Sequence, residues 1–430
     1  MSNNAAEIEQ DHAIEGAMAS AISESPEQPS SPAEPTEPAK PVTLVIEVPF
    51  DPVRRRGETS RMVGAPVSVR EAYLKALAAE VAGAGDVLDG RRIASIEVRG
   101  SAAMLPCDGL ARLFRNLRRS HDVDARGDFV LEMTPLTVGT PSLTSLNGCR
   151  FRTLRLDAFS ADKSVRSYLG LGPASEVGAA LAFLEKFGYS KISMRCVYGV
   201  PGMTERTMRG TVDLLDETSQ VKEFVLFSYE NAQAEGVSEG DLVRQYEAAA
   251  SHLASRGFAE YAPGRFFHND GRDGAFLDRV AGMDRLGFGA GAISLVDGMM
   301  WRNTSDIAAY IAGNGEFECI VCEAREVGIA SEDASEGASE SEQGDGRNGA
   351  RQAREALRRL RMLEPVETPA AGSPLGDALR ELEAAGLVAT APDAGSALDT
   401  ASTLALTTAG RALFGRVEAR LRDIAMRSSR

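Results

Sequence analysis

The chain has 430 residues and a formal net charge of −15, and 43% of its residues are hydrophobic. This length allows one large α/β domain and a smaller unit, while the negative charge argues against a general nucleic-acid-binding protein. No apolar run approaches a membrane span and the N-terminal residues lack a signal sequence, so we expect a cytoplasmic protein with no membrane span. The five cysteines fit free thiols in a reducing compartment.

Taken in chain order, an acidic leader precedes a regular alternation of apolar runs. Residues 1–41 are rich in Glu, Ala, Ser and Pro, and we expect them to be disordered because they can bury little apolar surface. Short apolar runs then alternate with helical patterns, which predicts right-handed crossovers and a parallel sheet. The predicted strands are 42–48, 93–98, 129–133, 151–156, 192–198 and 224–229. The predicted helices are 69–81, 108–119, 175–187, 204–215 and 240–255.

The last hundred residues predict a separate small unit. Residues 328–350 are acidic and rich in Ser and Gly, so we expect a disordered insertion. The segments after it predict a winged-helix-like order of two helices, two short strands and a final helix. These segments are 351–363, 375–385, 387–388, 403–407 and 409–426.

Several dispersed motifs carry a resemblance. Pro49 and Phe50 end the first strand, residues 198–202 read YGVPG, residues 257–261 read GFAEY and residues 286–294 read LGFGAGAIS. In this order they resemble the oxygen-independent coproporphyrinogen III oxidase and heme-chaperone branch of the radical SAM proteins. The resemblance implies a partial (β/α)6 barrel, with a tight packing role for the glycines of 286–294. Its parts would be the barrel at 42–260, a barrel extension at 261–327 and a winged-helix-like domain at 351–430.

The same resemblance locates the cofactor positions of that family. There, three cysteines after the first strand hold a [4Fe-4S] cluster; the corresponding residues here are Asp51, Arg55 and Glu58, none of which supplies a thiolate. We therefore expect neither the cluster nor SAM, no other metal, and no radical SAM catalysis, with heme as the one cofactor left open. The implied positions of a degenerate SAM cleft are Gly100, Glu132, Asp157, Tyr198 and Gly199.

Arginine occupies four positions that the resemblance places near the mouth of one cavity. These are Arg55, Arg99, Arg155 and Arg195. Because unpaired buried guanidinium groups are costly, they should either meet carboxylates such as Glu58, Glu132 or Asp157, or hold an anionic ligand. An internal salt-bridge network is the favoured alternative, and an anion site is the other.

Two further sequences bear on metal binding. His268 and Asn269 fall where the heme-chaperone branch has a heme-associated motif, so His268 is a candidate heme ligand, although local hydrogen bonding is the favoured alternative. Cys319 and Cys322 form a lone C-x-x-C, which predicts two ordinary thiols because no second ligand pair follows.

Three functional hypotheses follow. In the first, the chain is a coproporphyrinogen-oxidase-like and heme-chaperone-like protein of porphyrin and heme metabolism that binds a tetrapyrrole or another anionic small molecule without radical catalysis. In the second, it is a regulatory protein whose barrel is a platform and whose C-terminal unit contacts DNA or a protein partner. In the third, it is an active enzyme whose cluster is held by Cys196 or by the pair Cys319 and Cys322. The second requires a basic face made by Arg358, Arg359, Arg361, Arg411, Arg416 and Arg420.

Overall fold

A computed structural model describes residues 41–56, 61–139, 146–189, 191–316, 319–323, 345–369, 372–391 and 403–427. Within them, six strands lie side by side in chain order, and each neighbouring pair is parallel. They are β1 (Val42–Val48), β4 (Arg92–Gly100), β6 (Phe129–Met133), β7 (Thr153–Phe159), β8 (Ile192–Tyr198) and β9 (Val221–Ser228). These are the six predicted strands: β1, β6 and β8 have the predicted ends, and β4, β7 and β9 have shifted ends, so the predicted parallel sheet is confirmed.

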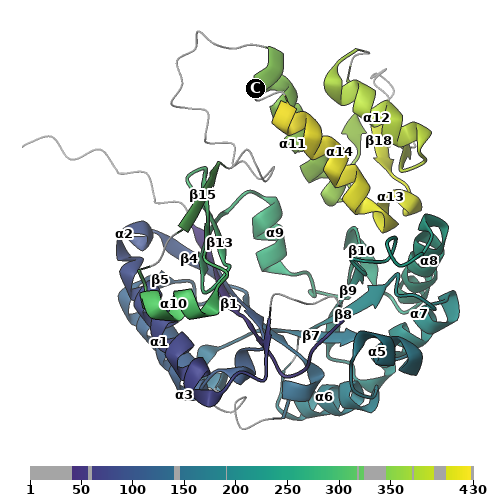
Figure 1. Cartoon of the computed structure of the whole chain (residues 1–430). Coiled ribbons are helices and arrows are strands. Elements are labelled where there is room, and N and C mark those ends of the chain that lie inside the picture. The colour runs from purple at the N-terminus through teal and green to yellow at the C-terminus, as the bar shows by residue number, and fades with distance from the viewer. Residues whose placement is uncertain are drawn as a thin grey trace, which may run out of the picture. The chain divides into compact units, whose positions relative to one another are not determined.

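Helices cover the outer side of this sheet. Figure 1 shows the strands in an arc with the helices outside it, and with α9 (Gly274–Val280) at the open side. Among the outer helices, the short α2 and α5 were not predicted. Helix α5 begins after Asp162, whose carboxylate accepts from the amides of Ser164 and Val165, and ends at Gly170 in the left-handed conformation. The outer helices are α1 (Val67–Gly83), α2 (Gly85–Leu88), α3 (Cys107–Ser120), α5 (Lys163–Leu169), α6 (Ser175–Lys186), α7 (Glu205–Val212) and α8 (Glu239–Ser255).

Additional strands extend both edges without joining them. β12 (Asp284–Phe288) lies parallel to β1 and is followed by antiparallel β13 (Ile293–Val296), β14 (Met299–Asn303) and β15 (Cys319–Glu323). At the other edge, β11 (Arg265–Phe267) and β10 (Ala259–Ala262) continue antiparallel from β9. Among the described strands no pair closes the ring, so the sheet is a partial barrel, as predicted. Smaller elements are β2 (Phe50–Asp51), β3 (Met62–Val63), β5 (Asp122–Val123) and α10 (Ile307–Gly313).

The glycines of the 286–294 motif bring this extension close to the barrel. A Cβ atom on Gly287 would lie 2.6 Å from the carbonyl oxygen of Ile293. Gly289 has φ of 102°, and a Cβ there would lie 2.5 Å from the carbonyl oxygen of Glu47. Tight backbone packing therefore requires glycine at both positions, as expected.

Alternate positions on each strand face opposite sides of the sheet. On β1, the residues Val42, Leu44 and Ile46 belong to the hydrophobic core under the helices, whereas Thr43 and Glu47 do not. The same alternation on the other strands places polar side chains on the inner side, which we call the lumen. This is unusual, because the inside of a complete (β/α)8 barrel is filled mainly with branched apolar residues.

The C-terminal unit has the predicted two helices, two strands and helical end, with corrected boundaries and with one unpredicted strand, β16, between the first two helices. Its first helix begins at Asp345, inside the segment expected to be disordered, and the predicted helix 409–426 is two helices, because the backbone leaves the helical conformation at Leu413. A small antiparallel sheet has the order β16-β18-β17. The elements are α11 (Asp345–Arg361), β16 (Val366–Glu367), α12 (Pro374–Ala384), β17 (Val388–Thr390), β18 (Thr403–Leu406), α13 (Thr408–Ala412) and α14 (Phe414–Arg427).

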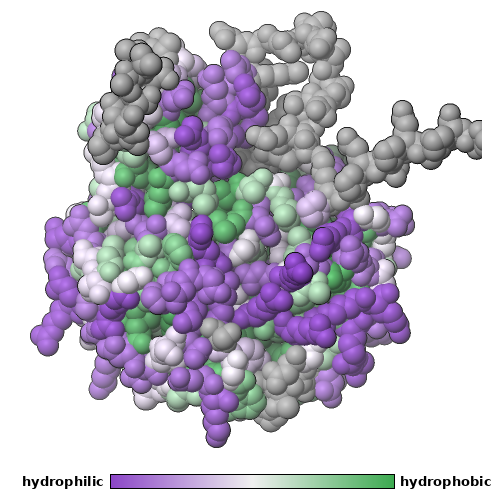
Figure 2. Space-filling model, turned by 180° about the vertical axis from the view of Figure 1, so that it is seen from behind, coloured by the Kyte–Doolittle hydropathy of each residue, from purple (hydrophilic) through white to green (hydrophobic). Residues whose placement is uncertain are grey.

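Two predicted disordered segments, residues 1–40 of the leader and 328–344 of the insertion, lie outside the described residues. No helix among the described residues is both long and apolar enough to cross a membrane. Seen from behind in Figure 2, hydrophilic residues cover most of the coloured surface, and hydrophobic ones appear in separate patches.

Candidate functional site

The loop after β1 places Asp51 and Arg55 against each other at the mouth of the lumen. Asp51 is 1% exposed and accepts hydrogen bonds from Arg55 Nη2 at 2.6 Å and from the amide of Val53 at 3.2 Å. Arg55 also donates to Asp157 Oδ2 at 3.2 Å, and its guanidinium lies over the ring of Phe159. Glu58, the third position of the predicted cluster motif, lies outside the described residues.

Neither of these two side chains fits an iron–sulfur cluster. Such clusters are held by cysteine thiolates, and a guanidinium has no lone pair to offer a metal. The carboxylate of Asp51 faces two arginines: it pairs with Arg55, and its Oδ2 atom lies 3.8 Å from Arg61 Nη1. The loop is therefore built around an ion pair.

Arg195 on β8 joins the two acidic residues predicted for the SAM cleft. Its Nη1 atom lies 3.1 Å from Glu132 Oε2 and 3.1 Å from Asp157 Oδ1. Glu132 also accepts from the amide of Gly100 at 3.2 Å and from Arg61 Nη2 at 2.8 Å. Arg61, which comes from the same loop as Arg55 and pairs with Glu132, was not predicted from the sequence.

Burial and charge shift the pKa values of these two carboxyl groups in opposite directions. Desolvation alone would raise the pKa of Glu132, but Arg195, Arg61 and other arginines outweigh it and lower that pKa from 4.5 to about 2. For Asp157, desolvation prevails over Arg195 and raises the pKa, helped by the negative charge of Glu132. Glu132 is thus the firmly ionised member of the pair.

A second group of ion pairs lies around Glu97 on β4. Glu97 Oε2 lies 2.8 Å from both Arg99 Nη2 and Arg279 Nη1, and its other oxygen accepts from Arg155. Arg155 also donates to Asp273 Oδ2 at 2.7 Å, while Arg99 lies 3.3 Å from Glu47. Although burial opposes ionisation, Arg155, Arg99 and Arg279 hold the pKa of Glu97 well below its ordinary value.

All four predicted arginines therefore donate to carboxylates, as the salt-bridge alternative predicts: Arg55 and Arg195 in the first group of ion pairs, and Arg99 and Arg155 in the second. Together these two groups, which we call the ionic network, pair seven arginines with seven carboxylates within the described residues. The arginines are Arg55, Arg61, Arg99, Arg155, Arg195, Arg265 and Arg279. The carboxylates are Glu47, Asp51, Glu97, Glu132, Asp157, Glu223 and Asp273.

Three other residues of the predicted SAM cleft make structural contacts. Gly100 has φ of 82°, and a Cβ atom there would lie 2.1 Å from the carbonyl oxygen of Val48 on β1. Gly199 has φ of 83° and its amide donates to Gln245 at 2.7 Å. Tyr198 donates its hydroxyl to the carbonyl oxygen of Ala412 at 2.6 Å, so it binds the C-terminal domain.

His268 does not share the mouth with the arginines. It follows β11 and its amide donates to the carbonyl of Lys222 near the start of β9, at the opposite end of the sheet from Arg55. Its Nδ1 lies 3.1 Å from the carbonyl oxygen of Gly257, which is the local hydrogen bond that the alternative interpretation predicts. Because a carbonyl can only accept, Nδ1 is the donor, and in the neutral form of the ring the lone pair is then on Nε2.

The cysteines proposed as substitute cluster ligands are not gathered at the lumen. Cys196 belongs to the hydrophobic core between sheet and helices, and burial raises the pKa of its thiol well above the ordinary range. Cys319 is on β15, at the far edge of the sheet from β8. No group of three His, Cys, Asp or Glu side chains that could hold a metal is found in the described part of the chain.

The arginines predicted to form a basic face on the C-terminal domain are paired instead. Arg411 lies 2.8 Å from Glu260 and Arg416 lies 2.7 Å from Glu239, so these two pairs bind the domain to the barrel. Within the domain, Arg420 pairs with Glu381 at 2.7 Å. The partners of the remaining three arginines, Arg358, Arg359 and Arg361, are Glu355, Glu364 and Glu418.

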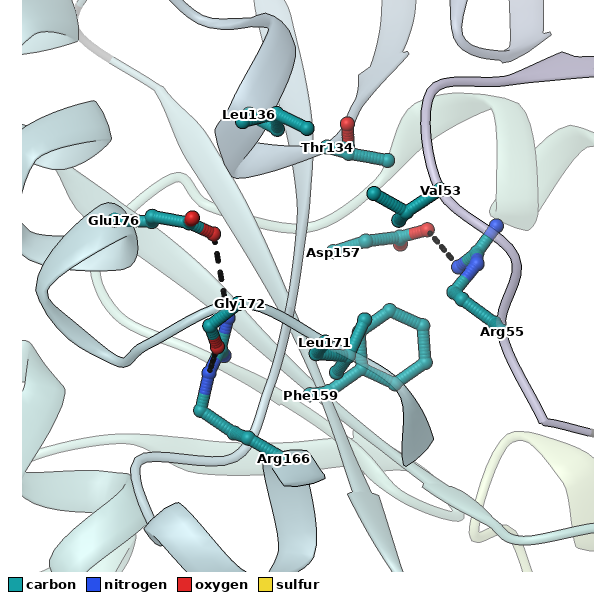
Figure 3. A pocket seen from close by; sticks show the side chains of 10 residues that line it. All are labelled: Val53, Arg55, Thr134, Leu136, Asp157, Phe159, Arg166, Leu171, Gly172 and Glu176. Atoms are coloured by element: carbon teal, nitrogen blue, oxygen red, sulfur yellow. Dashed lines mark hydrogen bonds and ion pairs between the residues drawn. The ribbon is translucent and has the colours of Figure 1, made fainter. Parts of the chain in front are cut away.

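A cavity of about 70 Å³ opens beside the Arg55–Asp157 pair (Figure 3). On its other side Arg166 donates to the carbonyl oxygen of Gly172 and lies 3.9 Å from Glu176. Ligand pockets usually measure about 300–1,000 Å³, so this cavity holds a few water molecules and not a tetrapyrrole.

A second cavity, of about 330 Å³, is lined by three arginines at the opposite, amino-terminal ends of the strands. Arg118 donates to the carbonyls of Gly148 and Cys149, and Arg152 donates to those of Ala125 and Arg126. These bonds tie loops together beneath the sheet; the third arginine of the lining is Arg150.

No protein-family model and no curated protein sequence matches this chain. Among solved structures, the chain is similar to coproporphyrinogen III oxidase (HemN) from Escherichia coli, a radical SAM enzyme, with a TM-score of 0.66 and 16% identity over 90% of each chain. It is less similar to SuiB from Streptococcus suis bound to S-adenosylmethionine, with a TM-score of 0.35 and 16% identity over 50% of this chain and 45% of that one. Native anSMEcpe with bound AdoMet gives a TM-score of 0.40 and 12% identity over 64% of this chain and 82% of that one. The last two scores are too low to support an argument. The chain therefore has the fold of coproporphyrinogen III oxidase over most of its length, as the sequence motifs predict.

Proposed function

We propose that this chain is a non-catalytic relative of coproporphyrinogen III oxidase that keeps the barrel, holds no iron–sulfur cluster and binds an anionic ligand. The main support is the ion pair between Asp51 and Arg55, which occupy two of the three positions where the family resemblance implies cluster ligands. A cluster at this loop would need thiolates, and it would also have to displace a guanidinium that two buried carboxylates hold.

The contacts of the residues predicted for the SAM cleft support the same proposal. Glu132 is surrounded by Arg61 and Arg195, while Tyr198 is engaged by the C-terminal domain. A bound SAM would have to compete with these contacts for the same side chains. Fold similarity alone does not supply an activity, and the chemistry of the site has to decide.

Coproporphyrin III is the first ligand to test, because the solved structure with the same fold is a coproporphyrinogen III oxidase and its substrate class carries several carboxylates. Heme is the second, because the Nδ1–H of His268 bonds a backbone carbonyl and leaves Nε2 available, an arrangement common in metal-binding histidines. The few cysteines and the fold fit our proposal of a cytoplasmic protein.

Anaerobic reconstitution with iron and sulfide tests the cluster part of the proposal. Wild-type protein is expected to retain no stoichiometric iron or sulfide and to show no charge-transfer absorbance in the visible range. The triple variant Asp51→Cys, Arg55→Cys and Glu58→Cys serves as the matched control, because it returns thiolates to the same loop. Stoichiometric cluster in the wild-type protein would overturn the proposal.

A further inference from the structure

One arginine of the lumen stands outside the ionic network. Arg285 lies on β12, where its Cα pairs with Thr43 of β1. It interacts electrostatically with Arg99, Arg279 and Glu97. Its Nε atom is buried and has no hydrogen-bond partner in the described structure. No carboxylate among the described residues lies within ion-pair distance of Arg285; the nearby acidic groups Glu97 and Glu47 pair with other arginines.

The surroundings of Arg285 carry an excess of positive charge. Arg99 and Arg279 share the carboxylate of Glu97 with Arg155, and among the described residues Arg99 has one further ion-pair partner, Glu47. Desolvation first, and then repulsion from Arg99 and Arg279, lowers the pKa of Arg285 to about 10. Each arginine of the ionic network lies within ion-pair distance of a carboxylate, whereas Arg285 has no such pair among the described residues, and the charges of Glu97 and Glu47 offset only part of the repulsion.

A half-buried cation without a counter-charge costs stability unless something else supplies the negative charge. A guanidinium is matched in shape to a carboxylate or phosphate, which can accept two parallel hydrogen bonds. We propose that Arg285, flanked by Arg99 and Arg279, is the contact point for an oxyanion of the ligand. This inference rests on the proposed function and assigns the anion to Arg285 on β12, beside Arg99, which is one of the four arginines that the sequence singled out.

Substitution of Arg285 separates a ligand contact from a structural role, because the two predict opposite changes in stability. If Arg285 awaits a ligand, Arg285→Met removes an uncompensated charge, and the melting temperature of the ligand-free protein should stay the same or rise by about 1–3 °C. If Arg285 were a structural partner, the same variant would melt at a lower temperature.

Binding is measured by isothermal titration of the full chain with coproporphyrin III and, separately, with inorganic phosphate. The two probes distinguish a carboxylate-bearing ligand from a phosphate-bearing one. At least one probe should bind wild-type protein. Arg285→Met should weaken that binding by about tenfold to a hundredfold, which is the affinity that one charged hydrogen bond typically contributes. Arg285→Lys, which keeps the charge but loses the planar fork, should lie between the two.

Arg302→Met on β14 is the matched control, because Arg302 is exposed and lies in the same antiparallel extension of the sheet, with β13 between its strand and β12. It should leave both affinity and melting temperature unchanged. Binding of neither probe by wild-type protein, unchanged affinity in Arg285→Met, or a lower melting temperature of that variant would each overturn the inference. The iron and sulfide assay does not depend on Arg285, so failure of the cluster proposal is seen separately.

Discussion

At the scale of single residues, the lumen is held by charge balance rather than by apolar packing. Burying a charged group is costly, and the cost is offset only when a partner of opposite sign and good geometry is present. Arg155 illustrates this balance, since it is 5% exposed and lies between Glu97 and Asp273. Each such pair stabilises the fold mainly by preventing the larger penalty of an unpaired buried charge.

Arg155→Met should therefore destabilise the protein strongly. The substitution leaves Glu97 and Asp273 with one fewer positive neighbour, and breaking a buried pair of this kind costs about 3–5 kcal/mol. Urea unfolding followed by circular dichroism measures the change. A loss as small as that of the exposed control Arg302→Met would show that the network contributes little.

The pKa of Glu132 predicts a loss of stability in acid. Its pKa is lowered from 4.5 to about 2 on folding, despite desolvation, chiefly by Arg195 and Arg61. The stability gained from the ionised carboxylate is therefore present above about pH 4.5 and is lost as the pH falls toward 2. Asp157, whose pKa is raised by burial, contributes with the opposite sign and offsets part of this loss.

Urea unfolding of wild-type protein and Glu132→Gln at about pH 6 and about pH 3 isolates this contribution. Wild-type protein should lose more unfolding free energy between these two pH values than the variant, whose side chain does not titrate. Equal losses in the two proteins would mean that Glu132 is not held ionised by its arginines.

The sequence predicted the arginines of the site better than their partners. Glu132 and Asp157 were anticipated, but Glu47, Glu97 and Asp273 come from β1, β4 and α9, which are far apart along the chain. A signal was present: Glu97 and Arg99 lie two residues apart on a strand, a spacing that places both on one face. Arg285 could not be singled out, because lack of a partner is a property of the folded arrangement.

At the scale of elements, long buried strands were predicted well and short or capped elements less well. All but one residue of each of β1 and β8 are buried, so these strands are covered on both faces. Helix α5 was missed, although Asp162 at its start and Gly170 at its end are typical helix boundary residues. The strands β12 to β15 were missed because the motif at 286–294 indicated a packing role and not the strands that carry it.

Besides apolar packing, a few polar contacts attach the C-terminal domain to the barrel, and these can be tested one at a time. Arg411→Met removes the 2.8 Å ion pair with Glu260. The loss is worth about 1 kcal/mol, so amide hydrogen exchange in α13 and α14 should quicken about fivefold while exchange in β1 stays unchanged.

The matched control for this attachment is Arg420→Met. Its partner Glu381 belongs to the same domain, so its loss should not loosen the domain from the barrel. Equal exchange rates in the two variants would mean that the Arg411 contact does not hold the domain in place.

At the scale of the whole molecule, the fold is that of a radical SAM enzyme, whereas the site lacks that family's cluster ligands at the two described positions. The fold matches a radical SAM enzyme over 90% of the chain, and six parallel strands in chain order form the partial barrel. Inside that barrel, the loop after β1 offers a carboxylate and a guanidinium where the resemblance implies thiolates. The sequence alone predicted both parts, because dispersed motifs report the scaffold while single positions report the chemistry.

The most direct test of this account is cleavage of SAM by the anaerobically reconstituted and chemically reduced protein, followed as release of methionine by chromatography. We predict no methionine above the level of a protein-free control, in the presence or absence of coproporphyrinogen III. Methionine released in proportion to protein concentration would contradict the account, because it would require a redox cluster in the barrel that we propose holds none.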